Sequence, residues 1–185
     1  VSLELAVPGL PFGEEEKSQR YALMLFNFIA GGGASSRLFL RLREELGLAY
    51  SIYSTHYASK GAGLFTVSAA VSPKQQLRVL GEIREILAGL AGGIGEEEFL
   101  RARAQIKSSF ILGLESVAAR ATYVGRNELL EGRAVEETEV LAALDRLEPR
   151  DIERLAARLL QNAPWALAVA GKVEDRAAYL PYIRP

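Results

Sequence analysis

The sequence predicts an α+β domain in which helices pack on one face of a largely antiparallel sheet, as a two-layer sandwich. Strand-like segments lie at the start, in the middle and at the end of the chain. Helical segments fill the remainder without regular βαβ alternation. Two of the strand-like segments follow one another across a glycine-containing turn, as in a hairpin. At 185 residues, without repeats or low-complexity segments, the chain is expected to form a single domain, 1–185.

The first quarter of the chain predicts a strand and two helices. Apolar residues alternate over Ser2–Val7, which is typical of a half-buried strand. A helix is expected over Glu14–Ala30, with acidic residues in its first turn, where the helix dipole favours them. A second helix is expected to begin at Ser35 or Ser36, whose hydroxyl can cap free N–H groups, and to stop at Gly47 in a left-handed conformation.

The middle of the chain predicts a β-hairpin. Leu48–Tyr57 and Leu64–Val71 alternate, are rich in aromatic and β-branched residues, and flank a turn at residues 60–63. One face of the second strand is apolar, whereas Thr66 and Ser68 mark the other face. That second face is therefore expected to be partly solvated or to meet a polar surface.

The remaining chain is expected to be mainly helical. Pro73 suits the first turn of a helix over Gln75–Leu90. Apolar periodicity predicts a long helical stretch over Glu96–Leu130, with breaks at Ser116 and Gly125. Two further helices and a buried final strand are expected over Glu136–Leu147, Arg150–Leu160 and Trp165–Ala170.

The composition excludes several classes of protein. The 22 basic and 23 acidic residues nearly cancel, which argues against a nucleic-acid partner. No apolar run approaches the roughly 18 residues that span a membrane, so we expect no membrane span and favour a soluble, cytoplasmic protein. Because the chain has no cysteine and a single histidine, His56, we expect no metal or cofactor to be bound by this chain. We interpret His56 as a surface or strand-end residue.

The glycine-rich stretch GGGASS, residues 31–36, leaves two readings open. A phosphate-binding P-loop requires a lysine after its last glycine, and a dinucleotide-binding fingerprint requires a strand before its glycines. Neither context is present, so a joint between two helices is favoured. An anion site at the start of the second helix, at Ser35 or Ser36, stays possible because free N–H groups gather there.

Arg43 and Tyr50 form the strongest candidate site. Arg43 lies near the edge of an apolar stripe and one turn before the helix ends, and Tyr50 begins the next strand. A joint at Gly47 can bring both side chains near one point. A guanidinium and a phenol together suit recognition of a carbonyl group or a developing oxyanion. The alternative is a solvated helix face, as for Arg41, which lies four residues before Glu45.

The run GGGASSRLFLRLREELGLAYS, residues 31–51, resembles the pitrilysin/insulinase family of zinc peptidases, which includes the mitochondrial processing peptidases. The resemblance continues through EEEFLRARAQIKSSF and LESVAARATYVGR to the final strand. It implies the LuxS/processing-peptidase-like metallohydrolase fold. Members of this family pair two similar α+β domains across a chamber, and the first domain carries an H-x-x-E-H zinc motif. This chain lacks that motif, so it resembles the C-terminal, non-zinc-binding half.

The resemblance also implies a function, the binding of substrate for a zinc metallo-endopeptidase that hydrolyses peptides between its two domains. An arginine and a tyrosine spaced as Arg43 and Tyr50 then hold the substrate main chain and the attacked carbonyl oxygen. Zinc is expected in a zinc-bearing N-terminal domain or partner subunit, so this chain alone should be inactive. The alternative is a non-catalytic structural or assembly homologue. Substrate contacts are also expected from the turn residues Gly32, Gly33, Ser35 and Ser36.

Overall fold

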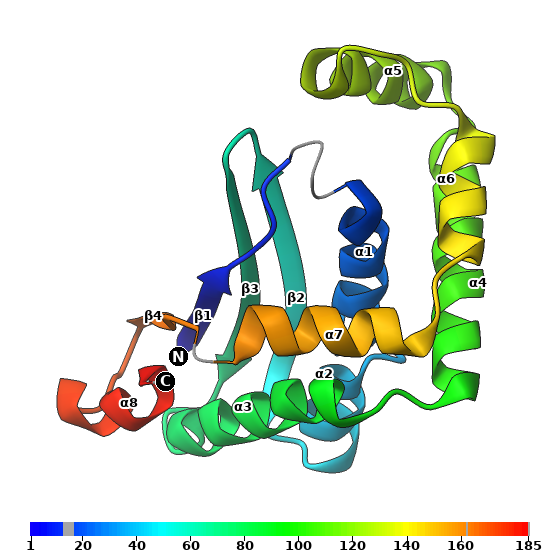
Figure 1. Ribbon diagram of the computed structural model, residues 1–185. Coiled ribbons are helices and arrows are strands. Elements are labelled where there is room, and N and C mark those ends of the chain that lie inside the picture. The colour runs from blue at the N-terminus through cyan, green and yellow to red at the C-terminus, as the bar shows by residue number, and fades with distance from the viewer. Residues whose placement is uncertain (13–16, 162, 185) are drawn as a thin grey trace.

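The computed structural model describes residues 1–12, 17–161 and 163–184 (Figure 1). In this part of the chain a four-stranded antiparallel sheet has the order β2-β3-β1-β4, and helices pack on one of its faces. The α+β fold class expected from the sequence is therefore confirmed. The expected acidic first turn at residues 14–16 lies outside the described residues. The strands are β1 (Ser2–Pro8), β2 (Ala49–Ser59), β3 (Ala62–Val71) and β4 (Ala166–Ala170).

The two faces of the sheet differ because side chains alternate along each strand. In β1, Leu3, Leu5 and Val7 are buried against the helices. Leu5 lies opposite Val67 of β3, which continues the same apolar face. On the other face Tyr53 and Tyr57 of β2 are exposed and Ser68 is half-buried, whereas Thr66 is only 4% exposed, so the expected solvation of this face does not extend to Thr66.

Three helices form the layer against the sheet. Helix α1 (Lys17–Gly31) packs on β2, and the Phe26 ring lies 4.9 Å from the Phe65 ring of β3. Helix α3 (Gln76–Gly92) packs against α7 (Pro149–Leu160), which crosses the layer in Figure 1. The apolar faces of these helices enclose the core because their buried residues recur at helical spacing.

The long helical stretch expected over residues 96–130 divides at Ser116 into α4 (Glu96–Gly113) and α5 (Val117–Glu131). The Ser116 hydroxyl accepts a hydrogen bond from the Ala119 N–H at 3.1 Å and so caps α5. The expected break at Gly125 is wrong, because one glycine costs a helix only about 1 kcal/mol. Helix α6 (Glu137–Asp145) then runs back along α4, while α5 extends from the far end of α4 toward the tip of the β2–β3 hairpin (Figure 1).

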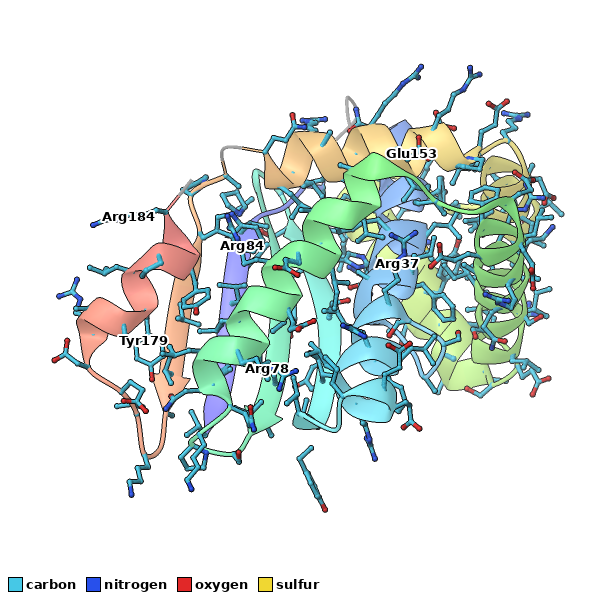
Figure 2. All side chains as sticks on the ribbon, turned by 90° about the horizontal axis from the view of Figure 1, so that it is seen from below. Arg37, Arg78, Arg84, Glu153, Tyr179 and Arg184 are labelled. Carbon is cyan, nitrogen blue, oxygen red and sulfur yellow. The ribbon has the colours of Figure 1, made fainter. Side chains whose placement is uncertain are left out.

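The end of the chain departs from the sequence-based expectation. The last strand is not buried, because β4 is an edge strand and its alternate alanines lie on the uncovered face. Helix α8 (Arg176–Ile183) was not expected, since it is short and contains Pro181. It is fastened to α3 by Tyr179, whose hydroxyl donates to Gln76 (Figure 2). Gln76 also begins α3, so Pro73 precedes that helix instead of lying in its first turn.

Candidate functional site

The helix that carries Arg43 has two parts. It begins as α2 (Arg37–Phe39) and continues as a π-helical segment, η2 (Leu40–Glu45), which replaces the α-helix expected from the sequence. The Leu46 N–H bonds to the Arg41 carbonyl at 3.0 Å, the i to i−5 pattern of a π-turn. Such turns are rare and occur frequently at functional sites. The fully buried Leu38 and Leu42 fasten both parts to the core.

The end of this helix leads directly into the sheet. Gly47 has φ +58°, so the expected left-handed stop is confirmed, and the Leu48 N–H bonds to the Leu42 carbonyl at 2.8 Å. Strand β2 then begins with a register shift between Ala49 and Ser51, which is a β-bulge. Tyr50 is the extra residue of this bulge. Bulges redirect side chains, and Tyr50 is 87% exposed.

Arg43 and Tyr50 are both open to solvent at this junction. The Arg43 guanidinium lies over the Phe39 ring, 5.0 Å from its centre. Among the described residues neither Arg43 nor the Tyr50 hydroxyl makes a hydrogen bond or an ion pair, and no such contact joins the two side chains. Both groups therefore keep their hydrogen-bonding capacity for a ligand. That they converge on one point stays a prediction.

The stretch GGGASS joins α1 to α2, as the sequence favours. A Cβ on Gly31 would lie 2.6 Å from the Ser54 backbone nitrogen, and one on Gly32 would lie 2.7 Å from the Phe28 Cα. These two glycines therefore let the end of α1 approach β2 and turn tightly. Gly33 is half-buried and Ser35 is exposed.

Ser36 occupies the N-cap position of α2, but its hydroxyl makes no capping hydrogen bond, so the expected serine cap is wrong. The side chain is only 1% exposed, and its hydroxyl has no partner among the described residues. The Ser36 carbonyl accepts a hydrogen bond from the Leu40 N–H at 3.0 Å, as in the first turn of a helix. Of the turn residues, Gly32 and Ser35 are the exposed ones that a bound molecule could reach directly.

The uncovered face of the sheet carries exposed tyrosines along β2. Tyr53 and Tyr57 are exposed on this face, in line with Thr55 between them, and Tyr50 stands at the end of the row. Among the described strands β2 pairs only with β3, and apart from the Ser59 carbonyl, which accepts a hydrogen bond from the Phe12 N–H, its outer edge presents free backbone N–H and C=O groups. Such an edge can accept an extended peptide as an additional strand.

No metal-binding cluster accompanies these groups. Within the described ranges, no three His, Cys, Asp or Glu side chains lie close enough together to hold a metal ion. The residues present therefore do not fit a zinc ion. The described helices also include none that is both long and apolar enough to cross a bilayer.

A large cavity lies elsewhere, at the tip of the hairpin, and neither Arg43 nor Tyr50 lines it. It has a volume of about 970 Å³ and includes His56, which is half-buried near the end of β2, in agreement with the strand-end alternative. Sequence reasoning missed the α5 residues Tyr123, Arg126 and Asn127 that face this cavity. Their i, i+3, i+4 spacing places them on one side of a helix, which was the available signal.

Comparison with known proteins identifies the family. Residues 1–106 match the family described as peptidase M16 inactive domain. An uncharacterized zinc protease of Streptomyces coelicolor is 37% identical over 175 residues, which cover 94% of this chain and 37% of the relative. An uncharacterized zinc protease of Bacillus subtilis is 34% identical over 166 residues, or 89% of this chain and 40% of the relative. The chain therefore spans about two fifths of the length of these relatives.

Solved structures support the same fold. A peptidase M16 inactive domain from Pseudomonas fluorescens superposes with a TM-score of 0.79 at 21% identity, over 90% of this chain and 39% of the other. A conserved protein from Enterococcus faecalis gives a TM-score of 0.76 at 27% identity, over 94% and 40%. The resemblance to the pitrilysin/insulinase peptidases is thus confirmed: the chain belongs to the peptidase M16 family and corresponds to its inactive domain.

Proposed function

We propose that residues 1–185 form the substrate-binding C-terminal half of a zinc metallo-endopeptidase, which hydrolyses peptides in a chamber between this domain and a zinc-bearing one. The observation that carries the proposal is the junction between η2 and β2. There Arg43 and Tyr50 are exposed, without hydrogen bonds or ion pairs to described residues, beside the free edge of a strand. These groups are what a domain needs to hold a peptide for chemistry supplied from outside it.

Each group has a distinct role in this proposal. The extended substrate pairs with the β2 edge through backbone hydrogen bonds, and Arg43 donates to a substrate carbonyl. The Tyr50 hydroxyl donates to the oxyanion that forms when the scissile carbonyl is attacked. The turn that contains Gly32, Gly33, Ser35 and Ser36 shapes the chamber wall and the contact between domains.

The zinc-bearing domain is expected in the remainder of the protein or in a partner subunit. The relatives called zinc proteases are more than twice as long as their match to this chain, which leaves room for such a domain. A bound zinc ion there supplies Lewis-acid activation of the attacking water. The residues of this chain bind and orient the peptide and stabilise negative charge.

The test is peptide cleavage by this chain combined with the zinc-bearing domain. Tyr50→Phe removes only the hydroxyl and should lower kcat about 10²- to 10³-fold, and Arg43→Ala should lower kcat/KM strongly. Arg101→Ala is the matched control for Arg43→Ala, because it changes an exposed arginine on α4, away from the junction. Cleavage at the wild-type rate by both site variants would contradict the site assignment.

A second function is an assembly subunit without catalytic activity. Helix α5 favours it, because this helix has no buried residue and carries the highly exposed Val117 and Leu129. Exposed apolar residues on a helix surface are typical of an interaction surface. A stable complex with the zinc-bearing domain that cleaves no unstructured peptide would favour this function over the first.

A further inference from the structure

The cavity at the hairpin tip has the features of a small-molecule site. It lies between α1, α4, α5 and the tip of the β2–β3 hairpin, and Figure 1 shows α5 placed across from that tip, beyond the first turn of α1. Its volume of about 970 Å³ is at the upper end of the range for ligand pockets. Its walls are largely apolar, with contributions from Leu10, Phe12, Leu23, Met24, Phe110 and Val140.

The cavity wall on the side of the hairpin is held in place by close backbone contacts. The Gly9 N–H bonds to the Gly63 carbonyl at 2.9 Å, and the Phe12 N–H bonds to the Ser59 carbonyl at 2.9 Å. A Cβ on Gly63 would lie 2.1 Å from the Leu10 carbonyl oxygen, so only glycine allows this approach. Residues 9–12 are therefore fastened to the hairpin, and both contribute to this wall of the cavity.

Polar groups line the cavity from two elements. Helix α5 presents Tyr123, Arg126 and Asn127, and β2 presents His56. The Nδ1 atom of His56 is buried and has no hydrogen-bond partner among the described residues. The Tyr123 hydroxyl and the Asn127 amide nitrogen likewise make no hydrogen bond of normal geometry with the described residues. A buried polar atom without a partner costs about 1–3 kcal/mol, which a ligand would recover.

Among the described residues that line the cavity, one cation has no ion-pair partner. Arg20 is paired with the buried Glu131 at 2.6 Å, so these two charges cancel. Arg126 makes no ion pair with any residue that the structure describes, and it is exposed, which places it at the cavity opening. Burial, together with the nearby charge of Arg126, lowers the pKa of His56, so the imidazole is neutral at pH 7. The described part of the cavity wall is therefore largely apolar, with one unpaired positive charge, Arg126, at the opening.

We propose that this cavity binds an apolar molecule that carries one carboxylate. Arg126 pairs with the carboxylate, and the Asn127 amide and one neutral tautomer of His56 donate hydrogen bonds to it. The apolar body of the ligand fills the space lined by Leu23, Met24 and Phe110. The chemistry fits either a fatty acid or the free C-terminus of an apolar peptide. The proposal does not depend on the peptidase function, since this cavity is separate from Arg43 and Tyr50.

Calorimetric titration of the 185-residue chain tests this proposal. The carboxylate probes are decanoate and the peptide acetyl-Leu-Phe-Leu. Their uncharged counterparts are decanol and the C-terminal amide of the same peptide. We expect saturable binding of at least one carboxylate probe. Arg126→Ala should weaken that binding about tenfold or more and leave the weak binding of the uncharged probes unchanged. Arg101→Ala, which changes an exposed arginine on α4, is the matched control.

The outcomes separate the two ligand sources. Binding of decanoate alone identifies a fatty acid, and binding of the peptide alone identifies a peptide C-terminus; either supports the proposal. Absence of saturable binding by both carboxylates, or equal affinity for carboxylate and uncharged probes, overturns it. Equal affinity of wild-type and Arg126→Ala protein overturns it as well. Unchanged circular dichroism and thermal unfolding of Arg126→Ala show that a lost signal comes from the site and not from unfolding.

Discussion

The two ends of the helix that follows the glycine-rich turn carry arginines in opposite environments. At the first turn, Arg37 is fully engaged: it makes two hydrogen bonds to the Glu98 carboxylate, at 2.9 and 2.7 Å, and others to the carbonyls of Gly89 and Gly93. At the last turn, Arg43 contacts the Phe39 ring and makes no hydrogen bond or ion pair within the described chain. The same helix thus carries one arginine with a structural role, Arg37, and one whose hydrogen-bond donors are available to a ligand, Arg43.

On this one helix, Arg37 therefore contributes to stability, whereas Arg43 is available for function. Arg37 ties α2 to the end of α3 and to the start of α4, where Figure 2 shows it beside those helices. The linker it contacts is also tied to α7, because the Ile94 N–H bonds to Glu153 at 3.0 Å. The contacts of Arg37 hold the first turn of the helix rigidly, and this fixes the position of the last turn, which carries Arg43. A site that holds a substrate requires such accurate placement.

The largest effect on stability is expected for Arg37→Ala. The substitution leaves a partly buried Glu98 carboxylate and two carbonyls without their donor, which should lower the free energy of unfolding by about 2 kcal/mol. Urea denaturation measures this loss. Arg41→Ala is the matched control on the same helix; its ion pair with Glu45 is exposed, so a loss of only about 0.5 kcal/mol is expected. Equal losses for the two variants would remove the distinction.

A smaller effect is expected for Gly47→Ala. Its φ of +58° strains any residue with a Cβ, although the surrounding space is open, so the free energy of unfolding should fall by about 1 kcal/mol. Gly113→Ala is the control, because Gly113 lies at the end of α4 with open space around it and is expected to be neutral or slightly stabilising. Thermal unfolding of both variants measures the difference. A neutral Gly47→Ala would show that the junction tolerates another backbone conformation.

The smallest effect is expected for Arg43→Ala. Because the side chain is exposed and contacts only Phe39, the free energy of unfolding should change by no more than about 0.5 kcal/mol. The same urea titration measures it, with Arg37→Ala as the reference. A loss near that of Arg37→Ala would mean that Arg43 is structural, and would weaken the case for its role in binding a peptide.

Much of the fold could be predicted because it is encoded locally. The alternation in β1 and the hairpin, the stop at Gly47 and the break at Ser116 each depend on a few neighbouring residues. The exposed position of β4 could not be predicted, because it depends on which strand lies at the edge of the sheet. Helix α8 was missed because Tyr179 stabilises it through Gln76, more than 100 positions earlier in the chain.

For the candidate site, the sequence by itself determined the helix stop and strand start that bracket Arg43 and Tyr50, since turn and capping preferences act over a few residues. Only the tertiary structure decided that Arg37 is engaged and Arg43 is not, because the partners of Arg37 come from α3 and α4. It also decided that His56 and Arg126 line one cavity. Contacts between distant segments depend on how whole helices pack, and no short stretch of sequence contains that information.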